Sequence, residues 1–508
     1  MVAAGILLSR ISGLIRDSVF AHYFGNSDVA DAFRAAFRIP NFLQNLFGEG
    51  VLSASMIPVY ARLRAGGKNE EATRVAEAVG AILALVTSVI VLLGILAAPW
   101  LIAVIAPGFE GEKRELTIRL VRIFFPAVGL LVFSAWCLGI LNSHRKFFLS
   151  YVAPVVSNAT IIATFLIFGS RAENLVITVA WGTVAGSALQ FLVQLPVVLK
   201  LLAPFPGAFQ LGTESVRTVL TNFFPVFVSR GVVQISAYVD SMIASFLPTG
   251  AVAALAYAQT LNLLPISLFG MAVSAAELPA MSSALGSQEE IAAALRRRIA
   301  GGLSQIAFFV VPSAVAFLVL GDVVVATIYQ SGVFTSADAR FVWAVLAGYA
   351  VGLLASTFGR LYSSAFYALR DTRTPLKIAT IRVSLSVVLG LIAALVLPGM
   401  LGLEPRWGTA GLALAAGIAG WVEYLLLRRS LQQRIGPVEY PAITVVKLWT
   451  AALIAGAAGF AIHNFVQVRS PRLEGLIVLA AYGLLYFAFA ALLGVAGPLQ
   501  RFLRRRSA

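Results

Sequence analysis

The most informative side chains of this sequence are arginines and carboxylates that interrupt apolar runs near the N-terminus. Arg10 and Asp17 are seven residues apart and share a helix face, and Arg34 and Arg38, four apart, share another. A charged side chain at bilayer depth costs roughly 2.5–3.5 kcal/mol, so each needs a partner, a water-filled cavity or a route to the interface. Guanidinium groups match the paired oxygens of a phosphate or diphosphate. These residues therefore predict the wall of an anion-binding cavity, with salt bridging between helices as the alternative.

The second half of the chain carries fewer charges of this kind. The candidates at membrane depth are Arg230, Asp240, Glu277, Arg360 and Arg382. Asp240 is expected either to pair with Arg230 or Arg382, or to bind a coupling cation or proton.

The sequence contains no motif typical of an enzyme or of a bound metal. His-Glu-x-x-His, Gly-x-Ser-x-Gly and Gly-x-x-x-x-Gly-Lys are all missing, and the three histidines are scattered near predicted helix ends. Cys137 is the single cysteine, so neither a disulfide nor a paired-cysteine metal site can form within one chain. We therefore expect a protein that is not an enzyme.

Composition places the charged residues in a membrane protein. Hydrophobic residues make up 59% of the 508 positions, charged residues only 12%, and the mean hydropathy is +0.89. The formal net charge of +15 does not predict nucleic-acid binding, because the cations lie mostly between apolar runs, where topology requires them. No cleavable signal peptide is expected, since the first apolar run contains Arg10 and Arg16 and leads into further apolar runs.

The apolar runs predict an all-α polytopic membrane protein with about fourteen transmembrane helices. The predicted helices lie at about 3–24, 29–61, 76–105, 116–142, 149–169, 174–201, 215–247, 251–283, 291–320, 338–369, 374–398, 408–430, 440–466 and 474–498. Alternate connections are rich in lysine and arginine, which places them, and both termini, in the cytoplasm. Examples are the connections around Lys68, Arg145, Arg297, Arg373 and Arg429.

An internal repeat organises the predicted helices. At an offset of about 223, Ala127–Leu131 aligns with the identical Ala350–Leu354, and Ser53–Pro58 aligns nearby with Ser274–Pro279. The repeat predicts two six-helix pseudo-symmetric lobes around a central cavity, plus two C-terminal helices. The predicted domains are residues 1–205, 206–435 and 436–508, the last including a basic cytoplasmic tail.

The second helix of each predicted repeat contains residues that bend or interrupt helices. These are Pro40, Gly48, Gly50 and Pro58 in the first repeat, and Pro265, Gly270 and Pro279 in the second. Breaks at corresponding positions of two repeats indicate a substrate site and hinges, and ordinary kinking for packing is the alternative.

Six short motifs carry a resemblance to a known family. They are Ser9–Asp17, Ala30–Phe33, Arg38–Asn41, Phe47–Gly50, Ala106–Phe109 and Asp371–Pro375. Their order and spacing resemble the MurJ (MviN) family of the multidrug/oligosaccharidyl-lipid/polysaccharide (MOP) exporter superfamily over essentially the whole chain. The resemblance implies a lipid II flippase of the bacterial cytoplasmic (inner) membrane, which moves the undecaprenyl-diphosphate-linked peptidoglycan precursor to the periplasmic leaflet by alternating access. It also implies that Met1 is an internal start, since members reach the first motif later.

The resemblance extends to individual residues. The substrate-binding residues that we expect are Arg10, Arg16, Asp31, Arg34, Arg38, Asn41, Glu49 and Arg230, with Asp240 as a residue for coupling. Gln44 and Thr260 stand where many members have arginine, so Arg34 and Arg230 are hypothesised to supply those cations or, alternatively, to pair with Asp31 and Asp240. The helices after about residue 436 imply a hydrophobic groove for the lipid tail.

The resemblance also bears on partners and energy supply. Gly390 and Ser386 stand where a sodium-binding member would have oxygen-rich ligands, so we expect no metal, no cofactor, and the membrane potential or an ion gradient as driving force. The expected partners are lipid II, membrane lipids and the cell-wall synthesis machinery. The alternatives are a flippase for another polyprenyl-linked glycan or a MATE-like exporter, although a drug exporter for cations would need acidic cavity walls.

The charge bias of the connections gives a testable topology. A cysteine at Gly67 should be cytoplasmic and one at Gly250 periplasmic, because basic connections stay in the cytoplasm. An impermeant thiol reagent applied to intact cells should label the second and spare the first, and the reverse labelling would overturn the predicted orientation.

Overall fold

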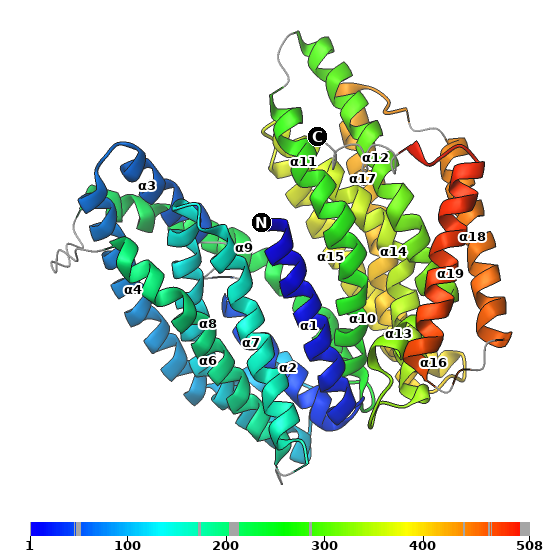
Figure 1. The fold of residues 1–508 in the computed structure, drawn as a ribbon, viewed down its shortest axis with the longest axis horizontal. Helices are drawn as coiled ribbons and strands as arrows, with labels where there is room; N and C mark the ends of the chain where they lie inside the picture. Colours follow the sequence, from blue (N-terminus) through cyan, green and yellow to red (C-terminus); the bar gives the residue numbers. More distant parts are fainter. Residues whose placement is uncertain are drawn as a thin grey trace. The chain divides into compact units, whose positions relative to one another are not determined.

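The computed structural model describes residues 2–44, 46, 52–170, 174–202, 213–283, 287–439, 442–465, 468 and 470–497. Within those ranges the regular structure is helical and contains no strand, which confirms the all-α class (Figure 1). The chain divides into two compact units, residues 1–252 and 253–508. The predicted division into three domains remains a prediction.

The helices of the first unit agree with the apolar runs within a few residues. They are α1 (Val2–Phe24), α2 (Asp28–Leu43), α3 (Ser53–Ala65), α4 (Asn69–Leu96), α5 (Ala98–Ile105), α6 (Gly111–Ser143), α7 (Phe147–Phe168), α8 (Leu175–Leu202) and α9 (Glu214–Ala244). The predicted helix at 76–105 is in fact α4 and α5, because Pro99 begins a new helix in its first turn.

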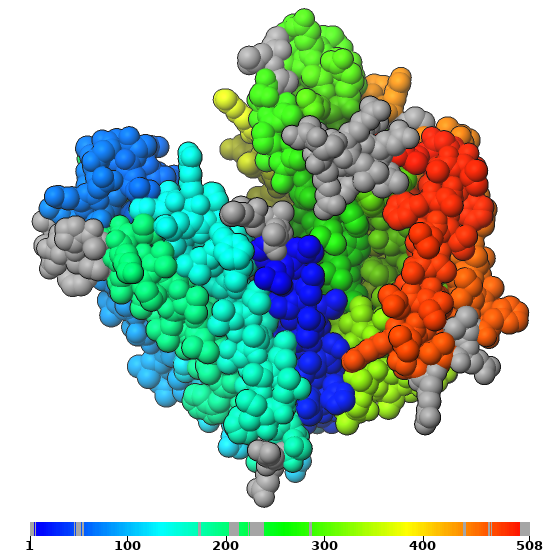
Figure 2. All heavy atoms as spheres, viewed as in Figure 1, coloured from blue at the N-terminus to red at the C-terminus, as the bar shows by residue number. Residues whose placement is uncertain are grey.

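The helices of the second unit follow the same pattern. They are α10 (Ala251–Pro265), η2 (Ile266–Met271), α11 (Ala272–Ser282), α12 (Gln288–Val319), α13 (Gly321–Tyr329), α14 (Ser336–Ala368), α15 (Arg373–Leu391), η3 (Ile392–Val396), α16 (Leu397–Met400), η4 (Pro405–Trp407), α17 (Gly408–Ile435), α18 (Ala442–Phe465) and α19 (Pro471–Leu492). The short helix α13 was not predicted from the sequence. Helices α18 and α19 pack together, and α19 lies on the surface of this unit (red in Figure 2).

Eleven helical segments of the described chain are long and apolar enough to cross a membrane. The predicted spans at 3–24, 29–61 and 215–247 are not among them. Of these three segments, the helix at 3–24 carries Arg10, Arg16 and Asp17, and these charges lower its hydropathy.

The regular α-helix is interrupted near some of the predicted residues in each half, whereas Pro58 and Pro279 lie inside the regular helices α3 and α11. Gln44, Leu46 and Leu52 have π-helical geometry, while Gly48 and Gly50 lie outside the described residues. In the second half the π-helix η2 follows Pro265 directly and contains Gly270. Proline removes a backbone donor and disturbs the regular hydrogen-bond ladder, which accounts for wider turns at these places.

Two of the positions chosen for thiol labelling have a left-handed backbone. Gly67 has φ of +75° and Gly250 has φ of +86°, a conformation that strains any other residue. The exposed neighbours Lys68 and Pro248 are therefore the better cysteine positions, and the buried Cys137 adds no background labelling.

Helices α14 and α17 pack with their backbones in contact. A Cβ added to Gly352 would lie 2.4 Å from the Gly417 Cα, and one added to Gly348 would lie 3.0 Å from the Ala413 Cβ. Small residues let membrane helices approach this closely, which gains packing energy and allows neighbouring side chains to meet.

The close contact predicts a large effect of the smallest substitution. Gly352→Ala should destabilise the protein by about 1–3 kcal/mol, because backbone atoms cannot move aside as a side chain can. Thermal unfolding of the purified protein in detergent would measure the loss. Gly301→Ala, where an added Cβ meets nothing within 4 Å, is the control and should be neutral or slightly stabilising. Equal unfolding temperatures for the two variants would contradict the packing argument.

Candidate functional site

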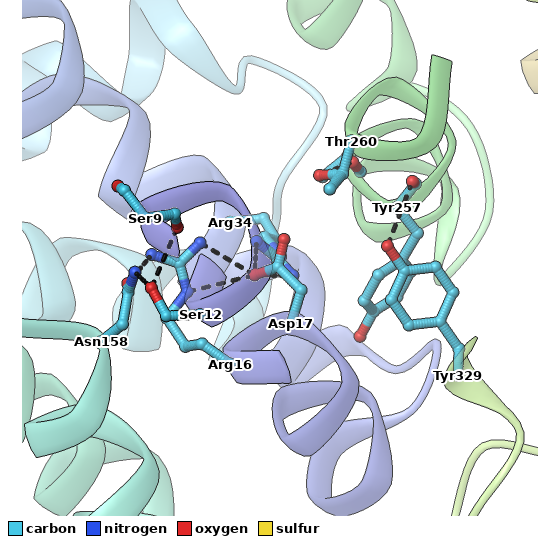
Figure 3. A network of polar contacts seen from close by, with 10 residues as sticks. Ser9, Ser12, Arg16, Asp17, Arg34, Asn158, Tyr257, Thr260 and Tyr329 are labelled. Carbon is cyan, nitrogen blue, oxygen red and sulfur yellow. Dashed lines mark hydrogen bonds and ion pairs between the residues drawn. The ribbon is translucent and has the colours of Figure 1, made fainter. Parts of the chain in front are cut away.

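The first unit holds two arginines around one buried carboxylate (Figure 3). Asp17 on α1 is 3% exposed. Its Oδ1 accepts hydrogen bonds from Arg16 Nη2 at 3.0 Å and from Arg34 Nη1, on α2, at 3.3 Å. Among the described residues, two guanidinium groups surround this one carboxylate. Guanidinium groups in a low-dielectric environment favour an anionic ligand.

A chain of polar side chains holds Arg16 in this position. Arg16 Nη1 donates to Asn158 Oδ1 on α7 at 3.0 Å, and Asn158 Nδ2 donates to Ser12 Oγ at 2.9 Å. The Ser12 hydroxyl in turn donates to the carbonyl oxygen of Ser9 at 2.9 Å (Figure 3). Sequence reasoning missed Asn158, although a polar side chain inside an apolar helix was a usable signal.

Arg34 has a carboxylate partner that was not predicted. The alternatives were an ion pair with Asp31 or a contact with substrate. The Arg34 guanidinium lies 3.3 Å from Asp17 Oδ1, and its Cζ lies 4.4 Å from the centre of the Phe20 ring. The aromatic face adds a favourable electrostatic contact for the cation. The short turn between α1 and α2 places Arg34 beside α1, which spacing along one helix could not reveal.

Asp31 belongs to a second cluster at one end of the first unit. Its side chain is 1% exposed, and Oδ2 accepts from Lys113 Nζ at 2.6 Å and from the Gly250 amide at 2.8 Å. Lys113 also lies 2.8 Å from Asp28 Oδ1. These contacts tie the start of α2 to the start of α6 and to the segment before α10.

The remaining predicted residues of the first unit are spread along α1, α2 and α9. Arg10 is exposed on α1, and Asn41 is half-buried on α2. The carbonyl oxygen of Arg38 accepts a hydrogen bond from the Tyr238 hydroxyl at 3.0 Å, and Asp240 is half-buried on α9. Glu49 and the Arg230 side chain lie outside the described residues.

In the second unit, Arg382 contacts a glutamate that the sequence did not indicate as its partner. Arg382 Nε, on α15, lies 3.1 Å from Glu423 Oε2 on α17. Thr260 donates its hydroxyl to the Ala256 carbonyl within α10. Within the described residues, no three or more His, Cys, Asp or Glu side chains lie together in a group suited to a metal ion.

The Asp371–Pro375 motif forms a cap at the start of α15. Asp371 accepts hydrogen bonds from the Arg373 and Thr374 amides and the Thr374 hydroxyl, and lies 2.6 Å from Arg434 Nη2. The Thr374 hydrogen bonds and the Arg434 charge lower the pKa of Asp371 to about 2. The carboxylate therefore stays ionised at neutral pH and satisfies backbone donors that the first helical turn leaves free.

Apolar helices of membrane length, interrupted in both halves and carrying a cationic cluster, define a polytopic membrane transporter. A solved MATE-family multidrug transporter of the MOP superfamily, in an inward-facing conformation, shares this fold with a TM-score of 0.66, at 19% identity over 84% of this chain and 95% of that one.

More specific comparisons agree with one another. A family model described as lipid II flippase MurJ matches residues 20–473, and this chain belongs to that family. The lipid II flippase MurJ of Burkholderia cenocepacia is 31% identical over 100% of this chain and 98% of its own length. A solved structure of a lipid II flippase MurJ in an inward closed conformation has a TM-score of 0.79, at 27% identity, covering 97% of this chain and 98% of its own.

The Asp17 cluster predicts coupling between its members. Asp17→Asn should destabilise the protein more than Arg34→Gln, because it leaves two cations without their carboxylate, and the double variant should recover part of the loss. A double-mutant cycle from thermal unfolding in detergent should give a coupling of about 1–3 kcal/mol. The exposed pair Arg114 and Glu115, 3.6 Å apart, is the control and should couple by about 0–1 kcal/mol. Additive effects at Asp17 and Arg34 would show that the pair contributes nothing.

Proposed function

We propose that this protein is a lipid II flippase of the bacterial cytoplasmic membrane. It moves the undecaprenyl-diphosphate-linked peptidoglycan precursor from the cytoplasmic to the periplasmic leaflet. The observation that carries the proposal is the buried Asp17 carboxylate with the guanidinium groups of Arg16 and Arg34 beside it, in a chain that belongs to the MurJ family over most of its length. A diphosphate is the part of this substrate that such a cluster suits, because guanidinium groups bind its oxygens in pairs.

The proposed transport needs no covalent step. Arg16 and Arg34 would neutralise the diphosphate inside the membrane, while Asn158 keeps the Arg16 guanidinium oriented before the substrate arrives. Two six-helix lobes would expose the headgroup to each side in turn, with the hydrocarbon tail remaining in the lipid. The helix interruptions at Gln44 and at η2 are the proposed hinges.

We infer a topology of about fourteen spans with both termini in the cytoplasm. The C-terminal helices would hold the lipid tail. In support, α19 is held against α12 by two hydrogen bonds, in which the Tyr482 and Tyr486 hydroxyls donate to the carbonyl oxygens of Pro312 and Phe308. Helix α19 can therefore form one side of a groove for the lipid tail. The exposed side chains of both helices are largely apolar, as a surface for an isoprenoid chain must be.

We further propose that transport uses no bound cofactor or metal and is driven by the membrane potential or a proton gradient, with cell-wall synthesis enzymes as partners. Ser386 offers one hydroxyl on α15 and Gly390 offers none, which is poor coordination for a hard cation. Lipid II translocation that persists on a sodium gradient alone, after collapse of the potential and the proton gradient, would contradict this.

The test of function is replacement of an essential native flippase by this gene. The wild-type protein should restore growth and clear the accumulated lipid II. Arg16→Gln should lower translocation about tenfold or more, because one charge-assisted hydrogen bond to the diphosphate is lost, and Arg16→Lys should retain part of the activity.

The control is Arg114→Gln, which removes an exposed charge at the start of α6 and should translocate normally. Membrane levels of every variant should be equal by immunoblot. Normal translocation by Arg16→Gln would remove the Asp17 cluster from the transport site, and failure of the wild-type protein to clear lipid II would overturn the proposed substrate.

A further inference from the structure

Unit 2 carries a cluster of two arginines and one glutamate that the proposed mechanism does not use. Arg382 and Glu423 form an ion pair at 3.1 Å, with side chains 33% and 21% exposed. Arg360 on α14 interacts electrostatically with both. Its guanidinium forms no hydrogen bond or ion pair with any residue in the described part of the chain. The three side chains therefore carry a net charge of +1, and the Arg360 guanidinium can contact an anionic ligand.

The three side chains lie well inside the membrane-spanning segments. Arg360 is eight residues before the end of α14, Arg382 nine after the start of α15, and Glu423 twelve before the end of α17. At a rise of 1.5 Å per residue these positions are about 12–18 Å from the helix ends, which is two to three turns inside each helix. A cation there without a counter-charge is costly.

The packing of α14 against α17 dictates the meeting of Arg360 and Glu423. Close contacts join Gly348 to Ala413, Gly352 to Gly417 and Ser356 to Gly420, a constant offset of 64 or 65 residues. The two helices therefore run side by side in one direction. One turn further on, the same offset places Arg360 opposite residues 424 and 425, next to Glu423. The small residues thus hold Arg360 and Glu423 on neighbouring turns of the two helices.

The exposed part of α14 in this region is polar. From residue 352 to residue 367 only Arg360 and Tyr367 are exposed, while Ser363 and Ser364 are half-buried and nearly all other side chains are buried. Arginine at bilayer depth faces water or a polar ligand and not hydrocarbon. On α15 the exposed Ile381, next to Arg382, offers apolar surface beside the charges.

We propose that Arg360, Arg382 and Glu423 form a second oxyanion-binding site, which takes the phosphate or diphosphate group of a lipid. Arg360 contacts the oxyanion directly, and Glu423 holds Arg382 in place and limits the affinity so that the ligand can leave. The ligand is either the diphosphate of the transported substrate, a choice that rests on the proposed function, or the phosphate of a bilayer phospholipid. Both sources present the same oxygens to the guanidinium groups.

Native mass spectrometry of the full-length protein in detergent tests the proposal, with farnesyl diphosphate as the probe. The wild-type protein should bind two molecules, one at the Asp17 cluster and one at Arg360. Arg360→Gln should bind the probe at the second site at least about tenfold more weakly and lose that molecule. Arg16→Gln should lose the molecule bound at the Asp17 cluster. Glu423→Gln should strengthen binding at the second site, because removal of the carboxylate raises its net positive charge.

The matched control is Arg340→Gln, on the same helix at its opposite end, where Arg340 is exposed. It should bind as the wild type does. A purely structural role for the cluster gives another pattern: Arg360→Gln and Glu423→Gln would both lower the unfolding temperature, and neither would change the number of molecules bound. That result, or an unchanged affinity in Arg360→Gln, would overturn the proposal.

Competition by phosphatidylglycerol identifies the source of the oxyanion. Displacement of the probe from the second site at comparable concentration assigns the site to bilayer phosphate, and retention of the probe assigns it to the substrate diphosphate. Lipid II translocation by the wild-type protein is measured separately, so failure of the proposed function and failure of this site give different results.

Discussion

The cost of a charge in a low-dielectric environment governs this structure. An ionised side chain at membrane depth is costly without a counter-charge, and the ion pairs found here join one helix to another. Asp17 brings α1 and α2 together, Asp31 joins α2 to α6, and Glu423 joins α17 to α15. The polar contacts that stabilise the fold are therefore the same contacts that concentrate positive charge for a ligand, and stability and function draw on one set of residues.

Close backbone packing is the second requirement, because an ion pair inside a membrane helix bundle forms only when the helices approach closely. The α14–α17 contact shows this plainly: glycine and alanine bring the backbones together, and the charged residues meet one or two turns later. In lipid there is little hydrophobic force between helices, so small residues and polar contacts together must supply the specificity.

Much of the fold could be predicted from the sequence because bilayer thickness sets the length of an apolar run. The bounds of α1, α6 and α12 agree with their predicted ranges within about five residues. The partners of the charges could not be predicted in the same way. Arg34 contacts Asp17 because the turn between α1 and α2 folds α2 back on α1. Lys113 contacts Asp31, from which it is separated by 82 positions of sequence. Helical spacing describes neighbours on one helix, whereas these pairs depend on which helices pack together.

The contact between Gly352 and Gly417 has a mechanical consequence. Helices whose backbones touch cannot slide past each other, since any shift along the axis drives a larger neighbour into the gap. Helices α14 and α17 should therefore move together as one rigid body, which keeps Arg360 and Glu423 at a constant separation. Helix α15 continues into the π-helical segment η3, whose wider turns are easier to deform. Motion within this unit should therefore move Arg382, on α15, relative to Glu423, which keeps its position on α17.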